Sequence, residues 1–163
     1  MKIAYVLLLS FLVTGWLRAE KQSINSNGLK DKRINVKSEG GMSLKTEGQK
    51  ASFYKNVLVS MGNLIMNCQQ LDVEYQEGKN NKLEAKTLRG TGKVFCEEKE
   101  KNIKAWCDEV IYDHKSEIMT VSSDKLSKVI KDDQVFESKS FDIFLKTGEL
   151  KVKGRSTIEI SLE

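Results

Sequence analysis

From about residue 33 to the C-terminus, apolar and polar residues alternate in short runs that are separated by Gly, Asn, Asp and Lys. A period of two residues is typical of β-strands with one buried face. No stretch holds the helical period of 3.6 residues over three turns. Gly62-Asn63 and Asp132-Asp133 have the composition of hairpin tips. The pattern predicts an all-β domain of stacked, short antiparallel strands over residues 33–163.

The alternating pattern also repeats along the chain. Similar segments begin at Ala51, Leu88, Met119 and Leu150, at intervals of roughly 31 to 37 residues, a range typical of repeat architectures. Each unit has the order strand, strand, turn, strand. The repeat predicts about four units that stack on one another as successive rungs.

Within each predicted strand, alternate side chains face the same side of the sheet. The larger apolar residues fall on one face, which we assign to the interior, and polar residues such as Lys55, Asn67 and Asp72 fall mostly on the other. Trp106 lies between two interior positions and is therefore expected to face outward. The interior residues are Val57, Val59, Leu64, Met66, Leu71, Val73, Tyr75, Val94, Val110, Tyr112, Phe136, Phe141 and Ile143.

Three cysteines, Cys68, Cys96 and Cys107, also occupy interior positions. Their spacing is not that of zinc ligands and the chain has a single histidine, His114, so we expect no metal site. Cys68 and Cys107 are equivalent positions of successive units, and stacking would bring them close. This suggests one disulfide between them, and free thiols packed as small apolar residues are the alternative interpretation.

The N-terminus has the three parts of a secretory signal peptide. Lys2 precedes an apolar run over residues 3–17, and Ala19 ends the segment with a small residue. The run is about 15 residues long, shorter than the roughly 20 needed to cross a bilayer as a helix. We therefore expect a signal peptide over 1–19 and a polar, flexible leader over 20–32. An uncleaved N-terminal anchor is the alternative.

Composition narrows the function classes. The 163 residues carry a formal net charge of +4, too small to indicate nucleic-acid binding by itself. With one histidine, any histidine-based catalytic triad would depend on His114 alone. Asp108 and Glu109 are adjacent in a predicted strand, so they face opposite sides and cannot act together. We expect a binding or scaffolding protein that is not an enzyme and has no cofactor.

The chain resembles the OstA-like family in the order of its motifs. Residues 33–44 resemble the opening strand of that family, and residues 51–59 resemble its first full strand. The turns at 112–116 and 145–149 resemble its recurring Y-D-x-K-T turn. Arg33 stands where the family often has Pro, and Lys55 replaces a Gly, so turn details differ more than architecture.

The resemblance implies a twisted, partly open β-jelly roll in the periplasm that binds lipopolysaccharide. The interior residues named above would line a continuous, vacant apolar trough for the acyl chains of lipid A. Burying an acyl chain of about 12 CH₂ groups gains roughly 10 kcal/mol. Such a chain must therefore stay covered by protein while it crosses an aqueous compartment. The protein would form part of a bridge that carries lipopolysaccharide from the inner to the outer membrane.

The resemblance also implies partners. These are an LptC-like protein of the inner membrane, an LptD-like protein of the outer membrane, and further copies of the chain that associate end to end. The contacts would form by strand addition at the terminal edge strands, through Ile34 and Val36 at one end and Ile158 and Ile160 at the other. Two other functions stay open: an LptC-like partner tethered by its N-terminus, and a structural β-stacking polymer without a lipid.

Overall fold

The computed structural model describes residues 33–45, 47–78 and 83–159. The expected signal peptide, the leader over 20–32 and Ile160 lie outside these residues. Within them, no helix is long and apolar enough to cross a membrane.

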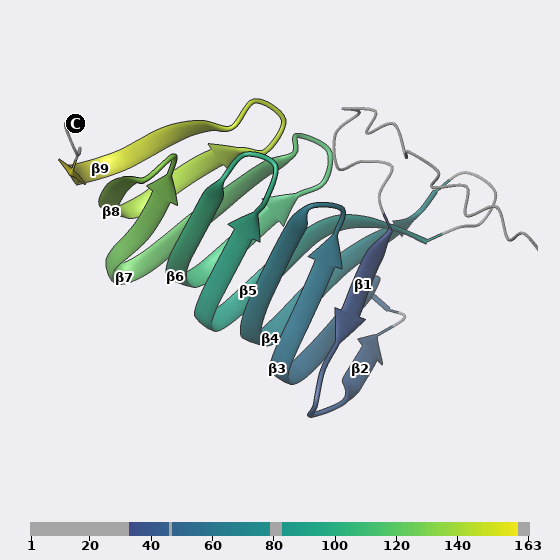
Figure 1. The fold of residues 1–163 in the computed structure, drawn as a ribbon. Coiled ribbons are helices and arrows are strands. Elements are labelled where there is room, and N and C mark those ends of the chain that lie inside the picture. The colour runs from purple at the N-terminus through teal and green to yellow at the C-terminus, as the bar shows by residue number, and fades with distance from the viewer. Residues whose placement is uncertain (1–32, 46, 79–82, 160–163) are drawn as a thin grey trace, which may run out of the picture.

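All nine strands in the described part of the chain join one antiparallel sheet (Figure 1). Its order is β1-β3-β4-β5-β6-β7-β8-β9, and β2 also pairs with β3. The strands are β1 (Ile34–Lys37), β2 (Met42–Lys45), β3 (Lys50–Met61), β4 (Leu64–Glu77), β5 (Leu83–Glu98), β6 (Ile103–Asp113), β7 (Ile118–Lys131), β8 (Gln134–Phe144) and β9 (Glu149–Glu159). Gly62-Asn63 and Asp132-Asp133 form hairpin tips, as predicted.

The sheet folds along a line into two facing walls (Figure 1). Between neighbouring strands from β3 to β9, the pairing register shifts near the middle of each strand. We call the two halves the β1 wall and the β2 wall. The β1 wall contains β1 and residues 57–61, 64–68, 94–98, 103–107, 127–131, 134–138 and 156–159. The β2 wall contains β2 and residues 50–54, 70–77, 83–91, 109–113, 118–122, 140–144 and 149–153.

Left-handed backbone at the fold line produces the bends. Lys55 (φ 63°), Asn56 (φ 49°) and Lys93 (φ 49°) have positive φ there, beside Gly92 (φ 80°). An extra residue in this conformation forms a β-bulge, which kinks a strand without ending it. The separate short strands seen in the sequence are therefore the two halves of longer bent strands. The predicted fold class, an all-β, partly open jelly roll, is confirmed.

Registered pairing lines up the interior side chains in rows that cross the sheet. One row of the β2 wall contains Ala51, Leu88, Met119 and Leu150, the four positions at which the repeat begins. A row of the β1 wall runs from Val36 on β1 to Ile158 on β9. The sequence repeat is therefore a structural repeat.

The two walls close on each other over the middle of the sheet. Side chains such as Leu71, Val110 and Phe141 are completely buried between them. At the open side of the fold, the tips of two hairpins meet: a Cβ added to Gly148 would come within 3.5 Å of the Lys101 Cδ. This contact joins the β5–β6 hairpin of one wall to the β8–β9 hairpin of the other.

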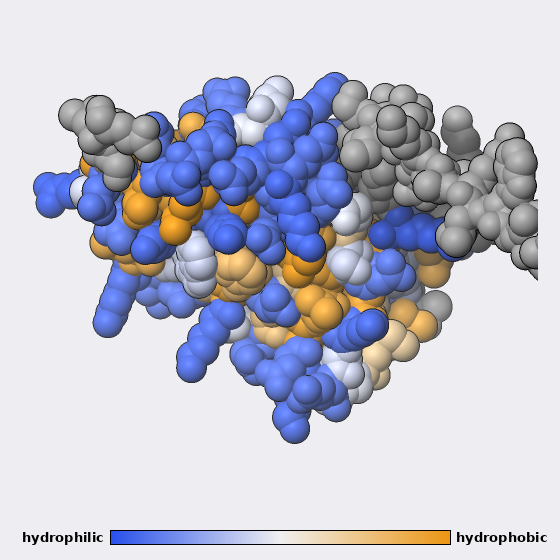
Figure 2. All heavy atoms as spheres, in the orientation of Figure 1, coloured by the Kyte–Doolittle hydropathy of each residue, from blue (hydrophilic) through white to orange (hydrophobic). Residues whose placement is uncertain are grey.

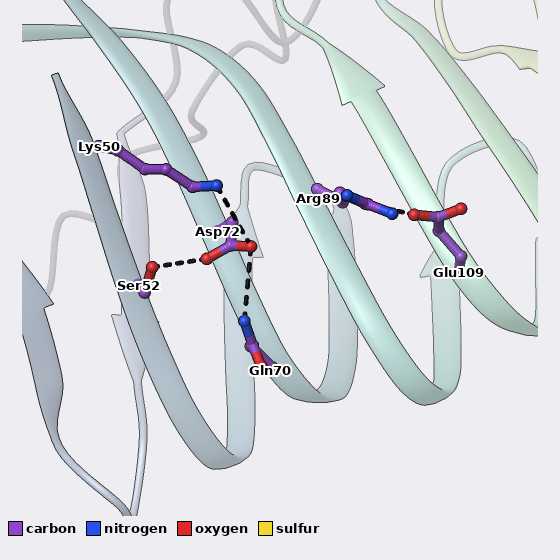
Figure 3. Close-up of polar contacts among 6 residues, drawn as sticks. All are labelled: Lys50, Ser52, Gln70, Asp72, Arg89 and Glu109. Carbon is purple, nitrogen blue, oxygen red and sulfur yellow. Dashed lines mark hydrogen bonds and ion pairs between the residues drawn. The ribbon is translucent and has the colours of Figure 1, made fainter. Parts of the chain in front are cut away.

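The outer face of the β2 wall is polar and paired (Figure 3). The Asp72 carboxylate accepts a hydrogen bond from Ser52 Oγ (2.5 Å) and lies 3.6 Å from the Lys50 ammonium. Arg89 on β5 forms an ion pair with Glu109 on β6. These groups satisfy one another in solvent.

Apolar residues are not confined to the interior. Figure 2 shows hydrophobic residues gathered among hydrophilic ones over β3 and β4. Trp106 is 40% exposed, as predicted, and its ring lies 5.2 Å from that of Phe95.

Candidate functional site

A groove of about 1160 Å³ opens at the β1 end of the folded sheet. It lies between β1 and the free ends of β4, β5 and β6 on the β2 wall. Its lining residues are Arg33, Ile34, Asn35, Val36, Leu44, Ala51, Phe53, Val73, Tyr75, Gln76, Leu83, Glu84, Ala85, Lys86, Asp113, His114 and Lys115.

The inner surface of the groove is apolar and continuous with the core. Val36, Phe53 and Val73 are half-buried and pack against the buried cluster. Leu44 on β2 also lines the groove and remains 58% exposed. Because β1 and β2 are only four residues long each, the walls have little at this end to fill the space between them.

The rim of the groove carries cations from three parts of the chain, namely Arg33, Lys86 and Lys115. The Asp113 carboxylate beside them accepts hydrogen bonds from the Ser116 hydroxyl and N–H, both at 2.7 Å. These two hydrogen bonds hold the pKa of Asp113 below its usual value, so it is ionised and engaged in its own turn. The arrangement suits an amphiphile with an apolar chain inside and an anionic group at the rim.

Backbone contacts fix the strands that carry the rim. The His114 N–H donates to the Lys86 carbonyl (3.0 Å), which ties the end of β6 to β5. His114 lies in the turn that follows β6, and its side chain is half-buried, with the ring edge-on to the ring of Tyr112 at 6.0 Å.

Only part of the predicted interior set lines this groove. Val73 and Tyr75 do, together with Ile34 and Val36 of the predicted edge strand. Phe136 is half-buried against the core. The remaining ten have exposed fractions of 3% or less: Val57, Val59, Leu64, Met66, Leu71, Val94, Val110, Tyr112, Phe141 and Ile143.

The expectation of a continuous vacant trough is therefore wrong for this structure. Facing side chains from the two walls fill the interior between β4 and β8, because each row supplies an apolar residue from nearly every strand. A groove opens where the rows end, at the β1 side. The alternation correctly assigned the interior face but could not show whether that face was filled.

Several residues that line the groove were not predicted from the sequence. Leu44 and Phe53 follow the alternation and could have been found from their place in the first strands. Arg33, Lys86 and Lys115 carry no shared sequence signal, because the topology alone brings their strands together.

The three cysteines are free thiols in the structure, and the suggested Cys68–Cys107 disulfide is wrong for it. Cys68 lies on β4 and Cys107 on β6, with β5 between them. Neighbouring strands are about 4.8 Å apart, so the two Cα atoms are separated by about 10 Å, beyond the roughly 7 Å that a disulfide can span. Equivalent positions of successive units are two strands apart because each unit is a hairpin.

Burial makes these thiols poor nucleophiles. It raises the pKa of Cys68 to about 11 and that of Cys107 to about 12. The pKa of Cys96 is raised well above its ordinary value, again chiefly by burial. No group of three or more His, Cys, Asp or Glu among residues 33–45, 47–78 and 83–159 could hold a metal ion.

Both ends of the sheet present open edges. In the described part of the chain, β1 and β9 are the terminal strands, and β2 pairs only with β3. The interior rows emerge at these ends: Ile158 on β9 is 52% exposed and Met42 on β2 is 60% exposed. Ile34 and Val36 on β1 are half-buried.

The fold is similar to that of a solved structure. LptH from Pseudomonas aeruginosa, described as the LptA homologous periplasmic component of the conserved lipopolysaccharide transport device, superposes with a TM-score of 0.70 at 15% identity. The match covers 82% of this chain and 98% of that one. Among curated proteins, none matches this chain. Residues 35–149 match the family described as LptA/(LptD N-terminal domain) LPS transport protein, and the chain belongs to this family.

Proposed function

We propose that this chain is a non-enzymatic periplasmic protein that binds lipopolysaccharide and forms part of the bridge between the inner and outer membranes. The acyl chains of lipid A would enter the groove at the β1 end. The phosphates of lipid A would stay at the rim, near Arg33, Lys86 and Lys115. An LptC-like inner-membrane protein, an LptD-like outer-membrane protein and further copies of the chain would be its partners.

The groove is the observation that carries this proposal. It joins an apolar inner surface to a rim that carries three cations, Arg33, Lys86 and Lys115, beside the carboxylates of Glu84 and Asp113, and the cations match the anionic half of a lipid. Covering about 12 CH₂ groups is worth roughly 10 kcal/mol, so an apolar surface without directional contacts is enough to hold a chain. Membership of a lipopolysaccharide transport family supports the choice of lipid.

The closed middle of the fold limits how far a bound chain reaches. As folded, Leu71, Val110 and Phe141 are completely buried in one apolar cluster. A chain that passes beyond the groove must separate the two walls and replace protein contacts with lipid contacts. This exchange is close to neutral in apolar area, since each buried surface is covered before and after.

The test uses lipopolysaccharide that carries a photo-crosslinker on an acyl chain. Leu44→Asp puts a carboxylate in the groove at a 58% exposed position, so we expect folding to be retained and crosslinking to fall at least tenfold. Leu58→Asp is the matched control, because Leu58 is 37% exposed and paired with Lys37 and Asn67 on the outer face. Crosslinking of Leu44→Asp at the level of Leu58→Asp would contradict the groove as the lipid site.

A further inference from the structure

The outer face of the β1 wall carries a band of apolar side chains that reach the surface. Two rows of the register cross this face from β3 to β8, and each of these strands contributes one large apolar residue to them. Leu58 and Trp106 are exposed and the others are half-buried. Hydrophobic residues reach the surface among hydrophilic ones across the front of the sheet in Figures 1 and 2. The band consists of Leu58, Ile65, Phe95, Trp106, Ile130 and Val135.

The two outer faces differ in how their charges are used. Of the four ion pairs in the described residues, three lie on the β2 wall. The fourth joins Lys104 to Glu97 on the β1 wall at 3.7 Å, directly beside the Phe95–Trp106 ring pair. Apolar residues that include aromatic rings, gathered in a patch with few charges, are typical of a protein interface. The outer face of the β1 wall therefore has the composition of a contact surface.

The charges of this face are complementary to the same face of a second copy. A two-fold axis parallel to the strands, between β5 and β6, sets β5 of one copy opposite β6 of the other and β4 opposite β7. Each central apolar residue then faces an apolar residue, and each central charge faces its opposite. The two carboxylates and two ammonium groups alternate at the corners of a square. The facing pairs are Phe95 with Trp106, Glu97 with Lys104, and Ile65 with Ile130.

Other two-fold arrangements of this face are disfavoured. An axis on β5 sets Glu97 opposite Glu97 of the second copy, and an axis on β6 sets Lys104 opposite Lys104. An axis across the strands exchanges the two rows, so that Val135 faces Glu137. Like charges in contact across an interface cost several kcal/mol. The pattern of the face thus selects the axis between β5 and β6.

The size of the face indicates a reversible association. Neighbouring strands are about 4.8 Å apart and residues rise about 3.3 Å along a strand, so five residues on each of the strands β3 to β8 cover about 24 Å by 17 Å. This is about 400 Å² per copy, in the range of weak, transient interfaces. Aligned sheets pack face to face about 10 Å apart with their side chains interdigitated. Glu and Lys side chains from facing strands can span that distance.

We propose that the outer face of the β1 wall is a dimer interface, at which two copies pack back to back about this axis. The two interiors, and with them the two grooves, lie on opposite sides of the dimer, because the band points away from the interior. The edge strands β1 and β9 lie outside the area formed by β3 to β8. The dimer goes beyond the proposed function and adds a lateral contact that sets two lipid sites side by side.

Sedimentation of the full chain tests the dimer. Every variant also carries Ile158→Asp, at an exposed residue of β9, to suppress association through the sheet edges. We expect one reversible step from monomer to dimer. Trp106→Asp should weaken it at least tenfold, and Ile111→Asp, at a 38% exposed residue on the outer face of the other wall, should change it less than twofold. Equal weakening by both, or protein that stays monomeric up to about 1 mM, would overturn the interface.

Charge reversal separates the interface from effects on folding. Glu97→Lys makes all four central groups cationic and Lys104→Glu makes them all anionic, so each variant alone should dimerise at least tenfold more weakly. In a mixture of the two variants, cations of one copy face anions of the other, and we expect a heterodimer at least tenfold tighter than either homodimer. Mixing cannot repair a folding defect. A mixture as weak as the separate variants would overturn the arrangement.

Glu74→Lys and Lys151→Glu are the matched control pair. Both residues are exposed on the outer face of the β2 wall, and the two substitutions change the net charge by the same amounts. Each variant should dimerise like the parent chain, and mixing should add nothing. A gain on mixing equal to that of the first pair would mean general attraction between opposite charges and would overturn the proposal.

Vesicles of phosphatidylethanolamine and phosphatidylglycerol test a membrane as the alternative occupant. The two rows carry two lysines and two glutamates from β3 to β8, so we expect no attraction to anionic lipid. Monomeric protein whose vesicle binding is lost in Trp106→Asp would assign the face to a membrane and overturn the dimer. Crosslinking of lipopolysaccharide in the groove should be the same in Trp106→Asp, so failure of the dimer leaves the proposed function standing.

Discussion

The closed middle of the sheet and its open β1 end are built from the same alternating pattern but differ in what covers the interior face. In the middle, between β4 and β8, the rows of the two walls face each other and exclude solvent, and side chains such as Val121 and Phe141 are completely buried there. At the β1 end, the two edge strands are only four residues long each, and Phe53 and Val73 are left half-covered. Strand length at the sheet edge, and not hydrophobicity, therefore distinguishes the buried core from the open groove.

The largest difference should appear in stability. Phe141 is completely buried, so Phe141→Ala should cost about 3–5 kcal/mol of unfolding free energy through lost burial and a cavity. Phe53 lines the groove and is only half-buried, so Phe53→Ala should cost about 1–2 kcal/mol. Urea denaturation of both variants measures the two values. Equal costs would mean that the groove end is as tightly packed as the middle.

All three cysteines lie in the closed middle of the sheet, so the reactivity of their thiols reports how tightly this region excludes solvent. A pKa of about 11 for Cys68, against an ordinary 9.0, leaves about a hundredfold less thiolate near pH 8. We expect no thiol to react with a disulfide reagent in the native protein within minutes, and all three to react after denaturation. Recovery of only one thiol from denatured, unreduced protein would show that a disulfide had formed.

The smallest effect concerns the buried Glu98 at the edge of the closed middle. Burial raises its pKa, although its carboxylate accepts a hydrogen bond from the Lys101 N–H at 2.6 Å. The folded state then binds more protons than the unfolded state just above the ordinary value of 4.5, so stability falls as pH rises through that window. Glu98→Gln should remove this fall and stabilise the protein near pH 7 by a few tenths to about 1 kcal/mol.

The exposed Glu100 in the same turn provides the control for this prediction. Glu100→Gln keeps the buried carboxylate and removes only the smaller contribution that the Glu100 charge makes to its raised pKa, so the fall in stability with pH should become smaller but remain. Thermal denaturation between pH 4 and pH 8 compares the two variants. A pH profile that Glu98→Gln leaves unaltered would contradict the assignment.

Much of the fold follows from local pattern. Period-two alternation identified the class, the repeat placed Ala51, Leu88, Met119 and Leu150 in one row, and the hairpin tips fell at the expected residues. The bends were not foreseen, because Lys55 and Asn56 look like the end of a strand in sequence. Their positive φ instead kinks a strand that continues.

The candidate site could be predicted only in part. The alternation identified Val73 and Tyr75, since it reports which face of a strand is apolar. The alternation carries no information on whether the facing wall fills the space. The ten interior residues that are buried in the core were therefore expected to line a trough. The basic rim depends on which distant strands become neighbours, and no local pattern encodes that.

The fold line has a mechanical consequence. Every strand from β3 to β9 crosses the fold line and belongs to both walls. The two walls are therefore connected along their whole length at the fold line. The walls can rotate apart about this line but cannot slide past each other. The Lys101–Gly148 contact holds them together at the open side of the fold. Any separation of the walls must therefore spread from one strand to the next, beginning at the β1 end, where the groove already separates them.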